Sequence, residues 1–180
     1  MKFLKRMGIF LGVLVALVLV IPLFVRSEYT VVRDVTINRN KADVFAYVVL
    51  LKNQDNYSVW AQADKNMKKT YTGTDGQAGF ISAWDSQQNQ VGAGEQEIKK
   101  VLAGERIDYE LRFLRPMKAT NEAFMKVEAA GDGKAKVIWG FHAKTPYPLN
   151  IMLLFFDPEK MIGQAFSDGL ATLKTILEKK

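Results

Sequence analysis

Apolar residues near the end of the chain recur three or four positions apart, which is the period of one helix face. Asp157 suits the N-cap of such a helix and Pro158 its first position. Lys179 and Lys180 place positive charge at the C-terminal end of the helix dipole. The pattern predicts a long amphipathic helix over 157–179 that needs a broad apolar partner. Its inward face consists of Ile162, Phe166, Leu170, Leu173 and Leu177.

Most of the remaining chain carries β-branched or alternating segments that predict strands. The clearest runs from Ile107 to Phe113, where apolar residues alternate strictly with Asp108, Glu110 and Arg112. Residues 41–51 have the apolar spacing of a helix, and a short helix or irregular turn is expected over 53–60. The other expected strands are 29–37, 67–71, 80–84, 91–102, 119–129 and 137–141.

Short turns connect consecutive strands in this series, which implies an antiparallel meander. We expect the strand over 91–102 to be bent, because Gly92 and Gly94 begin it. The apolar face of such a sheet and the apolar face of the terminal helix can bury one another. The expected fold class is therefore α+β, with a curved antiparallel sheet of about seven strands closing around the C-terminal helix.

Residues 7–25 carry no charged side chain and predict one membrane-spanning helix. At about 1.5 Å per residue the segment approaches the roughly 30 Å hydrocarbon core of a bilayer. Lys2, Lys5 and Arg6 precede it, so the positive-inside rule places the N-terminus in the cytoplasm. A cleaved signal peptide is the alternative, but cleavage needs small residues and the run ends in bulky ones.

This pattern predicts an uncleaved signal anchor in the inner (cytoplasmic) membrane. Residues 1–6 would form a cytoplasmic basic flank, 7–25 a single transmembrane pass, and 27–180 an extracytoplasmic domain.

The positive charge of the chain belongs largely to this N-terminal part. The net charge is +6 and the pI about 9.4, and Lys2, Lys5, Arg6 and Arg26 account for four of those charges, leaving +2 for the rest. A near-neutral domain lacks the basic surface of a nucleic-acid-binding protein. The chain has no cysteine, which excludes disulfides, thiolate metal sites and cysteine nucleophiles.

The ionisable residues do not form a recognisable catalytic set. His142 is the only histidine, and its parity is opposite to that of Trp139 and Phe141, so we expect it to face solvent at a strand end. The carboxylates of Glu95, Glu97, Asp108 and Glu110 could pair as general acid and base, but parity places them on the solvated face of the sheet. We therefore expect no catalytic residue, no metal site and no cofactor.

Several short motifs occur in a characteristic order along the chain. They are 44–48 (VFAYV), 57–60 (YSVW), 91–94 (VGAG), 109–113 (YELRF), 136–139 (KVIW) and 160–163 (KMIG). In this order they resemble the polyketide cyclase/dehydrase-like proteins of the SRPBCC (START-like) superfamily, over about residues 29–178. Tyr57 and Val59 stand where the family pattern usually has Trp and Pro.

The resemblance implies the helix-grip fold, with a deep apolar cavity between the sheet and the terminal helix. In that superfamily the cavity typically holds lipids, sterols, polyketides or other hydrophobic small molecules, and only some members are enzymes.

Strand parity and this topology direct one set of side chains into the expected interior. Gln96, Tyr109 and Asn121 are polar, so each would meet a ligand oxygen, a water or another core group. The aromatic residues fit a ligand cavity or simple core packing equally well. The candidate ligand-binding residues are Trp60, Trp84, Gln96, Tyr109, Leu111, Phe113, Asn121, Met125, Trp139, Phe141 and Phe166.

The uncharged segment 149–156 permits two interpretations. It could add a turn or two of buried helix, or form an exposed apolar lip at the cavity mouth that touches the bilayer. For the whole chain we expect a membrane-anchored binding protein for a hydrophobic small molecule or lipid. A cyclase or dehydratase acting on a polyketide-like substrate is one alternative, and a protein-interaction or chaperone-like module is another.

Overall fold

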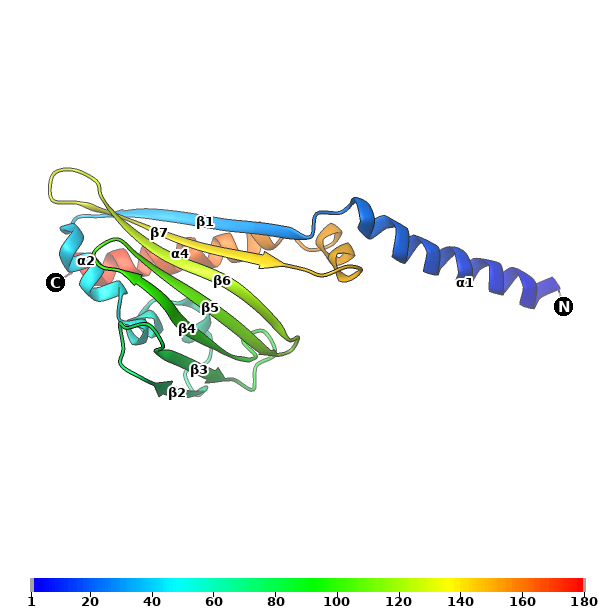
Figure 1. The fold of residues 1–180 in the computed structure, drawn as a ribbon, viewed down its shortest axis with the longest axis horizontal. Helices are drawn as coiled ribbons and strands as arrows, with labels where there is room; N and C mark the ends of the chain where they lie inside the picture. Colours follow the sequence, from blue (N-terminus) through cyan, green and yellow to red (C-terminus); the bar gives the residue numbers. More distant parts are fainter. Residues whose placement is uncertain (1, 180) are drawn as a thin grey trace.

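The computed structural model describes residues 2–179 of the chain, and side chains from Phe3 onward. Met1 and the side chain of Lys2, in the expected basic flank, and Lys180, at the expected helix end, lie outside the described residues. The described chain forms a curved, seven-stranded antiparallel sheet with the strand order β1-β7-β6-β5-β4-β3-β2 (Figure 1). The strands are β1 (Glu28–Ile37), β2 (Lys68–Thr72), β3 (Ile81–Asp85), β4 (Ala93–Leu102), β5 (Arg106–Arg115), β6 (Ala119–Ala129) and β7 (Ala135–Lys144).

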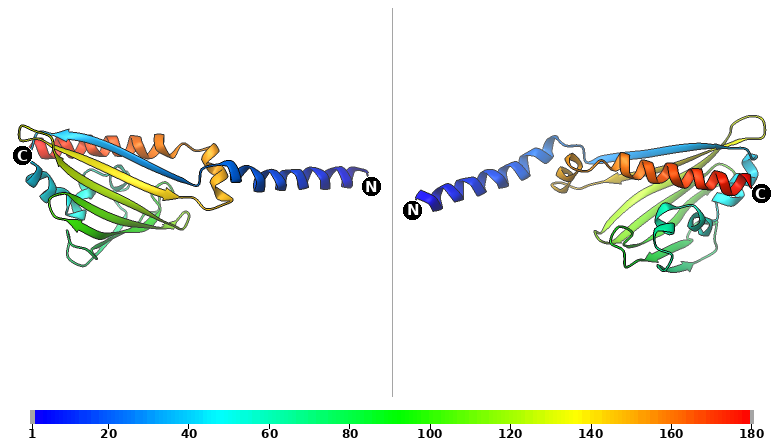
Figure 2. Two further views of the ribbon diagram at one scale, coloured as in Figure 1. Left: turned by 45° about the horizontal axis from the view of Figure 1, so that its top comes forward. Right: turned by 180° about the vertical axis from the view of Figure 1, so that it is seen from behind.

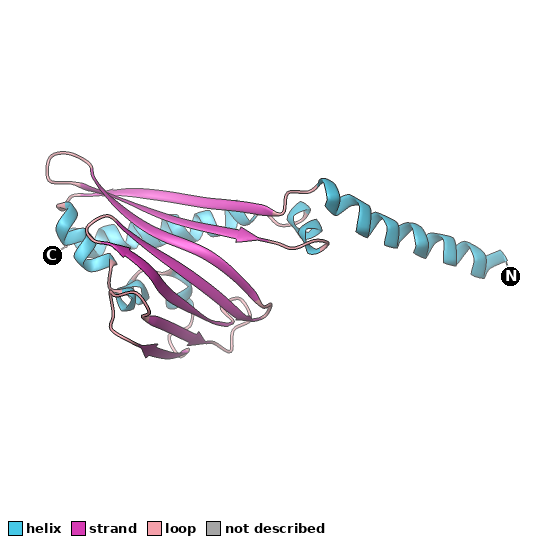
Figure 3. Ribbon diagram, in the orientation of Figure 1, coloured by secondary structure: helices cyan, strands magenta, loops and turns pink. Residues whose placement is uncertain are grey.

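The meander predicted from the sequence is confirmed, since each strand from β2 to β6 pairs with the strand that follows it in the chain. The first strand, β1, instead pairs with the last, from Glu28 opposite Lys144 to Ile37 opposite Ala135. The helices lie at the ends of the sheet and on its concave side (Figure 3). They are α1 (Lys2–Val20), η1 (Ile21–Phe24), α2 (Lys41–Val48), η2 (Leu51–Asn56), α3 (Val59–Ala63), η3 (Leu149–Leu154) and α4 (Pro158–Glu178), the η elements being 3-10 helices.

The terminal helix α4 forms where its periodicity predicts, and the carboxylate of Asp157 caps it by accepting a hydrogen bond from the Lys160 backbone N–H. Its inward residues Phe166, Leu170 and Leu173 are buried. The helix runs alongside β1, as the view from behind shows (Figure 2), and packs mainly against that strand. The N-terminal half of α4 also faces the concave side of the sheet, where Ile162 and Phe166 line a cavity.

Several boundaries differ from the sequence-based expectation, and two of them have a clear cause in the backbone. The helix expected over 41–51 ends at Val48, because Leu50 takes an extended conformation before η2 begins. The strand expected over 91–102 begins at Ala93, because Gly92 lies in the preceding turn with φ +64. A Cβ on Gly92 would lie 2.2 Å from the Arg115 carbonyl oxygen, so both the turn and this approach need glycine.

The N-terminal helix α1 projects away from the sheet (Figure 1). Residues Phe3–Phe24, in α1 and η1, are long and apolar enough to cross a membrane, and they are the one such segment among the described residues. The segment is 6% buried, so it is not a core helix of the domain. The helical part begins at Lys2, before the expected start at Met7, so Lys5 and Arg6 lie within its first turns.

Candidate functional site

A cavity of about 300 Å³ lies between the concave face of the sheet and the helices α3 and α4. That volume is at the lower end of the roughly 300–1,000 Å³ typical of small-molecule sites. The lining comes from η2, α3, the strands β2 to β7 and the N-terminal half of α4. The lining residues are Leu51, Gln54, Asp55, Ser58, Trp60, Ala61, Met67, Lys69, Ser82, Trp84, Gln90, Val91, Gln96, Leu111, Phe113, Ala123, Trp139, Phe141, Ile162 and Phe166.

Aromatic rings form one wall of the cavity, where α4 meets the sheet. The rings of Trp139 and Phe166 stack with centroids 4.3 Å apart, and Trp60 meets Phe166 edge-on at 6.0 Å. Gly169 permits the helix to approach this closely, because a Cβ there would lie 3.1 Å from the Trp139 ring. The wall therefore joins α3, α4 and β7 through ring contacts that are each worth about 0.5–1.5 kcal/mol beyond burial.

A second aromatic pair lies across β3, β4 and β5. Trp84 and Phe113 both pair with Gly94 in the strand register, and their rings meet edge-on with centroids 5.9 Å apart. A Cβ on Gly94 would lie 2.7 Å from the Trp84 ring, so the rings come together because position 94 has no side chain. This pair covers the end of the cavity nearest the β3–β4 turn.

Polar side chains interrupt this apolar lining. Ser82 lies opposite Gln96 in the register of β3 and β4, and both are buried. Neither side chain makes a hydrogen bond to another residue in the part of the chain that the structure describes, 2–179. Gln96 lines the cavity, so its amide is placed to bind a ligand oxygen or a water there.

An ion pair lies at the rim of the cavity, between η2 and β2. Lys69 Nζ and the Tyr71 hydroxyl both donate to the carboxylate of Asp55. The pKa of Tyr71 is raised well above its usual value. Burial of the hydroxyl is the larger cause, and its hydrogen bond to Asp55 is the second. Asp55 and Lys69 are the two charged residues in the lining, so the polar end of a ligand would be recognised here or at Gln96.

Most of the residues proposed from strand parity do line the cavity. Tyr109, Asn121 and Met125 are buried on the inward side of their strands, but they lie outside the lining. Tyr109 and Met125 belong to the continuous hydrophobic core, so core packing explains their burial. Burial also raises the pKa of Tyr109, which keeps its hydroxyl neutral. The proposed residues that line the cavity are Trp60, Trp84, Gln96, Leu111, Phe113, Trp139, Phe141 and Phe166.

Sequence reasoning placed Trp60 at the cavity but missed the rest of the segment between α2 and β2. Residues 53–58 are polar and have no apolar period, so nothing in them indicated a cavity wall. In the structure, η2 and α3 fold back under α4 (Figure 2), and Asp55, Ser58 and Ala61 face the cavity. The contact between η2 and β2, made by Asp55 and Lys69, depends on tertiary packing, so no local sequence pattern predicts it.

The apolar segment 149–156 is helical over most of its length, but most of its side chains are exposed rather than buried. Residues 149–154 form η3, and Phe155, the most exposed residue of the segment, is 81% exposed. The segment is exposed and apolar, as the second interpretation expected, but no residue of 149–156 lines the cavity, so its expected place at the cavity mouth is wrong, while contact with a bilayer stays a prediction. Asn150 is instead buried against the end of the N-terminal segment, where its amide donates to the carbonyl oxygens of Pro22 and Val25.

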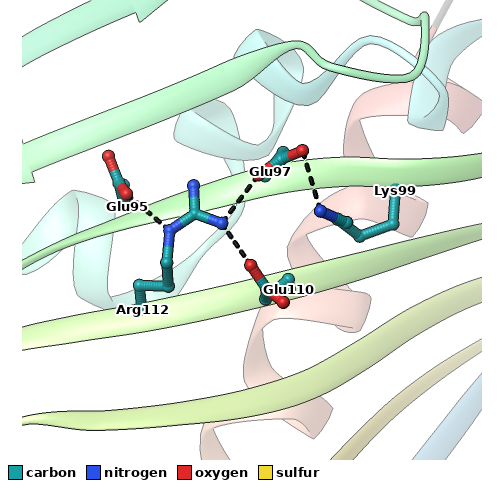
Figure 4. Close-up of polar contacts among 5 residues, drawn as sticks. All are labelled: Glu95, Glu97, Lys99, Glu110 and Arg112. Carbon is teal, nitrogen blue, oxygen red and sulfur yellow. Dashed lines mark hydrogen bonds and ion pairs between the residues drawn. The ribbon is translucent and has the colours of Figure 1, made fainter.

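The outer face of the sheet carries the carboxylates that could have paired for catalysis. Arg112 lies between Glu95, Glu97 and Glu110 and donates to all three, with 2.6 Å between Arg112 Nη1 and Glu97 Oε2 (Figure 4). Hydrogen bonds from Arg112, and then from Lys99, lower the pKa of Glu97. These carboxylates are structural acceptors on the outer face, as expected, and none of them reaches the cavity.

His142 also lies on the outer side, where its Nδ1 is 3.0 Å from the Thr30 hydroxyl on the neighbouring strand β1. It lies near the end of β7 on the outer side, as expected, and is half-buried. Among residues 2–179, no group of three or more His, Asp or Glu side chains could hold a metal ion.

Replacing Arg112 by Gln should destabilise the domain by about 1 kcal/mol at pH 7. The substitution removes the cation shared by three carboxylates and leaves them to repel one another. Because Arg112 lowers the pKa of Glu97, the stability it provides is fully present above the unfolded pKa of about 4.3 and is lost as the pH falls through the folded value.

Denaturant unfolding from pH 3 to pH 8 measures this dependence. The wild-type advantage should shrink below about pH 4.3, while Lys126→Gln, which removes a single exposed pair with Glu128, should cost less at every pH. A cost for Arg112→Gln that is the same at pH 3 and pH 8 would contradict the prediction.

Similar folds occur among solved structures. An uncharacterised protein from Rhizobium leguminosarum is 14% identical, with a TM-score of 0.59 over 85% of this chain and 96% of that one. Ara h 8.0201 is also 14% identical, with a TM-score of 0.58 over 85% and 99% of the two chains. This is the helix-grip fold. An Aha1 dimer from Colwellia psychrerythraea shares it, at 12% identity and a TM-score of 0.57 over 83% and 96%.

At these identities the likeness extends to the helix-grip fold alone. No protein-family model matches the chain, and no curated protein sequence matches it. The fold class expected from the sequence is confirmed, and the narrower family is taken up below.

Proposed function

We propose that this protein binds a hydrophobic small molecule or lipid in the cavity between the sheet and α4, while α1 and η1 anchor it in a membrane. The observation that carries the proposal is a cavity of about 300 Å³ whose walls are mostly apolar and aromatic and whose lining includes Gln96, a residue that is 8% exposed and whose amide makes no hydrogen bond to another described residue. An apolar cavity with a few convergent polar groups is typical of sites for ligands of this kind.

The chemistry of the lining suggests the form of the ligand. The aromatic wall of Trp60, Trp139 and Phe166 suits an apolar body. Gln96 and the Asp55–Lys69 pair suit one or two oxygen atoms, because they offer both donors and acceptors. A cavity of this volume would hold a modest ligand, or one segment of a longer lipid chain.

The motifs that resemble the polyketide cyclase/dehydrase-like proteins of the SRPBCC superfamily support the same proposal, since that superfamily typically encloses hydrophobic ligands in this position. The enzyme alternative lacks support from the cavity. Its charged lining residues, Asp55 and Lys69, neutralise one another in an ion pair, and Tyr109 lies outside the lining.

Native mass spectrometry of the full chain, released from detergent, tests the binding function. We expect a bound apolar molecule of defined mass that is lost when the protein is unfolded. A chain that carries no such molecule and takes up no fatty acid, sterol or polyketide-like probe would contradict the proposal. That outcome would favour the protein-interaction or chaperone-like alternative.

The anchor proposal makes a separate prediction. Because bulky residues end the apolar segment at Ile21 to Val25, the mature protein should keep its N-terminus and partition with the inner membrane. N-terminal sequencing of protein purified from the membrane fraction measures this. A mature chain that begins near Ser27 would show instead that the segment is a cleaved signal peptide.

A further inference from the structure

The end of the N-terminal segment is held against η3 by side-chain hydrogen bonds. The Asn150 amide donates to the Pro22 carbonyl oxygen at 2.8 Å and to the Val25 carbonyl oxygen at 2.9 Å. The Tyr147 hydroxyl donates to the Leu19 carbonyl oxygen at 2.8 Å. The last carbonyl groups of a helix have no partner within the helix, so these bonds cap the segment where it ends.

The residues around this cap form a group of exposed apolar side chains, whereas exposed apolar residues on most proteins are scattered singly. No charged residue occurs in 145–156. A contiguous exposed apolar patch of this kind marks an interaction surface. We define the collar as Tyr147, Leu149, Met152, Leu154, Phe155 and Phe156, which are between 39% and 81% exposed.

The cap fixes the collar relative to any membrane that the anchor crosses. At about 1.5 Å per residue, the apolar segment Phe3–Phe24 is about as long as the roughly 30 Å hydrocarbon core is thick. Pro22 therefore falls at the outer boundary of the bilayer when the segment spans it. Asn150 donates a hydrogen bond to the Pro22 carbonyl oxygen, so the collar around it lies close to this boundary.

From this geometry we infer that the collar is a second membrane contact, which docks into the outer interface of the same bilayer that the anchor crosses. The inference rests on the anchor part of the proposed function. The partner of the collar is a lipid surface, because the collar continues the exposed apolar surface of Leu23 and Phe24 at the end of the anchor. Tyrosine suits that interface because its hydroxyl can stay wet while its ring is apolar, and phenylalanine and leucine can bury their side chains at the boundary between headgroups and acyl chains.

Docking at the collar would set the orientation of the domain relative to the membrane. None of the collar residues lines the cavity, so the contact does not gate the ligand directly. Two contacts, the anchor and the collar, hold a body against a plane more firmly than a single tether at Arg26 would.

Fluorescence quenching by spin-labelled lipids tests this inference on the full chain in phosphatidylcholine–phosphatidylglycerol vesicles. The absence of native cysteine permits single labels at chosen positions. Phe155→Cys reports the collar and Val13→Cys reports the anchor. Asp132→Cys is the control, because the β6–β7 turn lies at the end of the sheet far from α1 (Figure 1). Each labelled residue is exposed, so the label has room outside the fold, and circular dichroism of each variant checks that the fold is kept.

We expect the Phe155→Cys label to show blue-shifted emission and to lose intensity with spin labels near the lipid headgroup. The Val13→Cys label should lose intensity with spin labels deep in the acyl chains, and the Asp132→Cys label with neither. Leu154→Cys, labelled in the same way, should behave like Phe155→Cys.

Three results would overturn the inference, and they separate it from the anchor proposal. If the collar labels resemble Asp132→Cys while Val13→Cys is quenched, the anchor stands and the collar contact is wrong. If neither the collar nor Val13→Cys is quenched, both fail. A blue shift at the collar that depends on protein concentration and not on lipid would show that a second copy of the chain covers the patch.

Discussion

Replacing Ala123 by Phe should abolish uptake of a fluorescent fatty acid probe by the full chain while leaving the fold intact. Ala123 lies in the middle of β6, buried, and lines the cavity between Tyr109 on β5 and Phe141 on β7. A phenyl ring at this position would occupy the cavity of about 300 Å³. Because the ring enters empty space, it should avoid the 1–3 kcal/mol cost of overpacking a filled core.

Ala129→Phe is the matched control, since Ala129 lies at the exposed end of the same strand. It should bind the probe as the wild type does. Titration of probe fluorescence measures the affinity, and circular dichroism with thermal unfolding measures the fold. Equal binding by the wild type and Ala123→Phe would mean that the probe does not occupy this cavity.

Replacing Leu170 by Ala should lower the free energy of unfolding by about 2–5 kcal/mol. Leu170 is 1% exposed and belongs to the hydrophobic core, one turn after Phe166 on the buried face of α4, the helix that packs against β1. Truncation removes buried methyl groups and leaves a void that rigid strands cannot fill. For a domain of marginal stability this is a large part of the total.

Urea unfolding monitored by tryptophan fluorescence measures the change. Leu114→Ala is the matched control, because Leu114 is half-exposed near the end of β5 and should lose less than about 0.5 kcal/mol. A loss below about half a kcal/mol for Leu170→Ala would mean that α4 presents a different face to the sheet. Such a result would also place Phe166 outside the cavity wall.

Local periodicity in the sequence determines most of the fold. A spacing of three and four residues places Phe166, Leu170 and Leu173 on one buried face, because a helix turns by 3.6 residues whatever surrounds it. Strict alternation does the same for β5, where Tyr109 is buried and Arg112 lies on the outer face. These outcomes depend on backbone geometry alone, so a single sequence was sufficient to predict them.

Only the tertiary structure decided which inward residues meet empty space. Tyr109 and Leu111 share one face of β5, yet Leu111 lines the cavity and Tyr109 does not. Alternation along a strand determines which face of the sheet a side chain lies on. Whether that side chain then lines the cavity or packs in the core depends on where along the strand it lies relative to the covering helices. The Asp55–Lys69 pair and the bond between Asn150 and Pro22 likewise join segments that no local pattern relates. Such contacts depend on how distant elements pack, and that packing sets both the cavity and the attachment of the anchor to the domain.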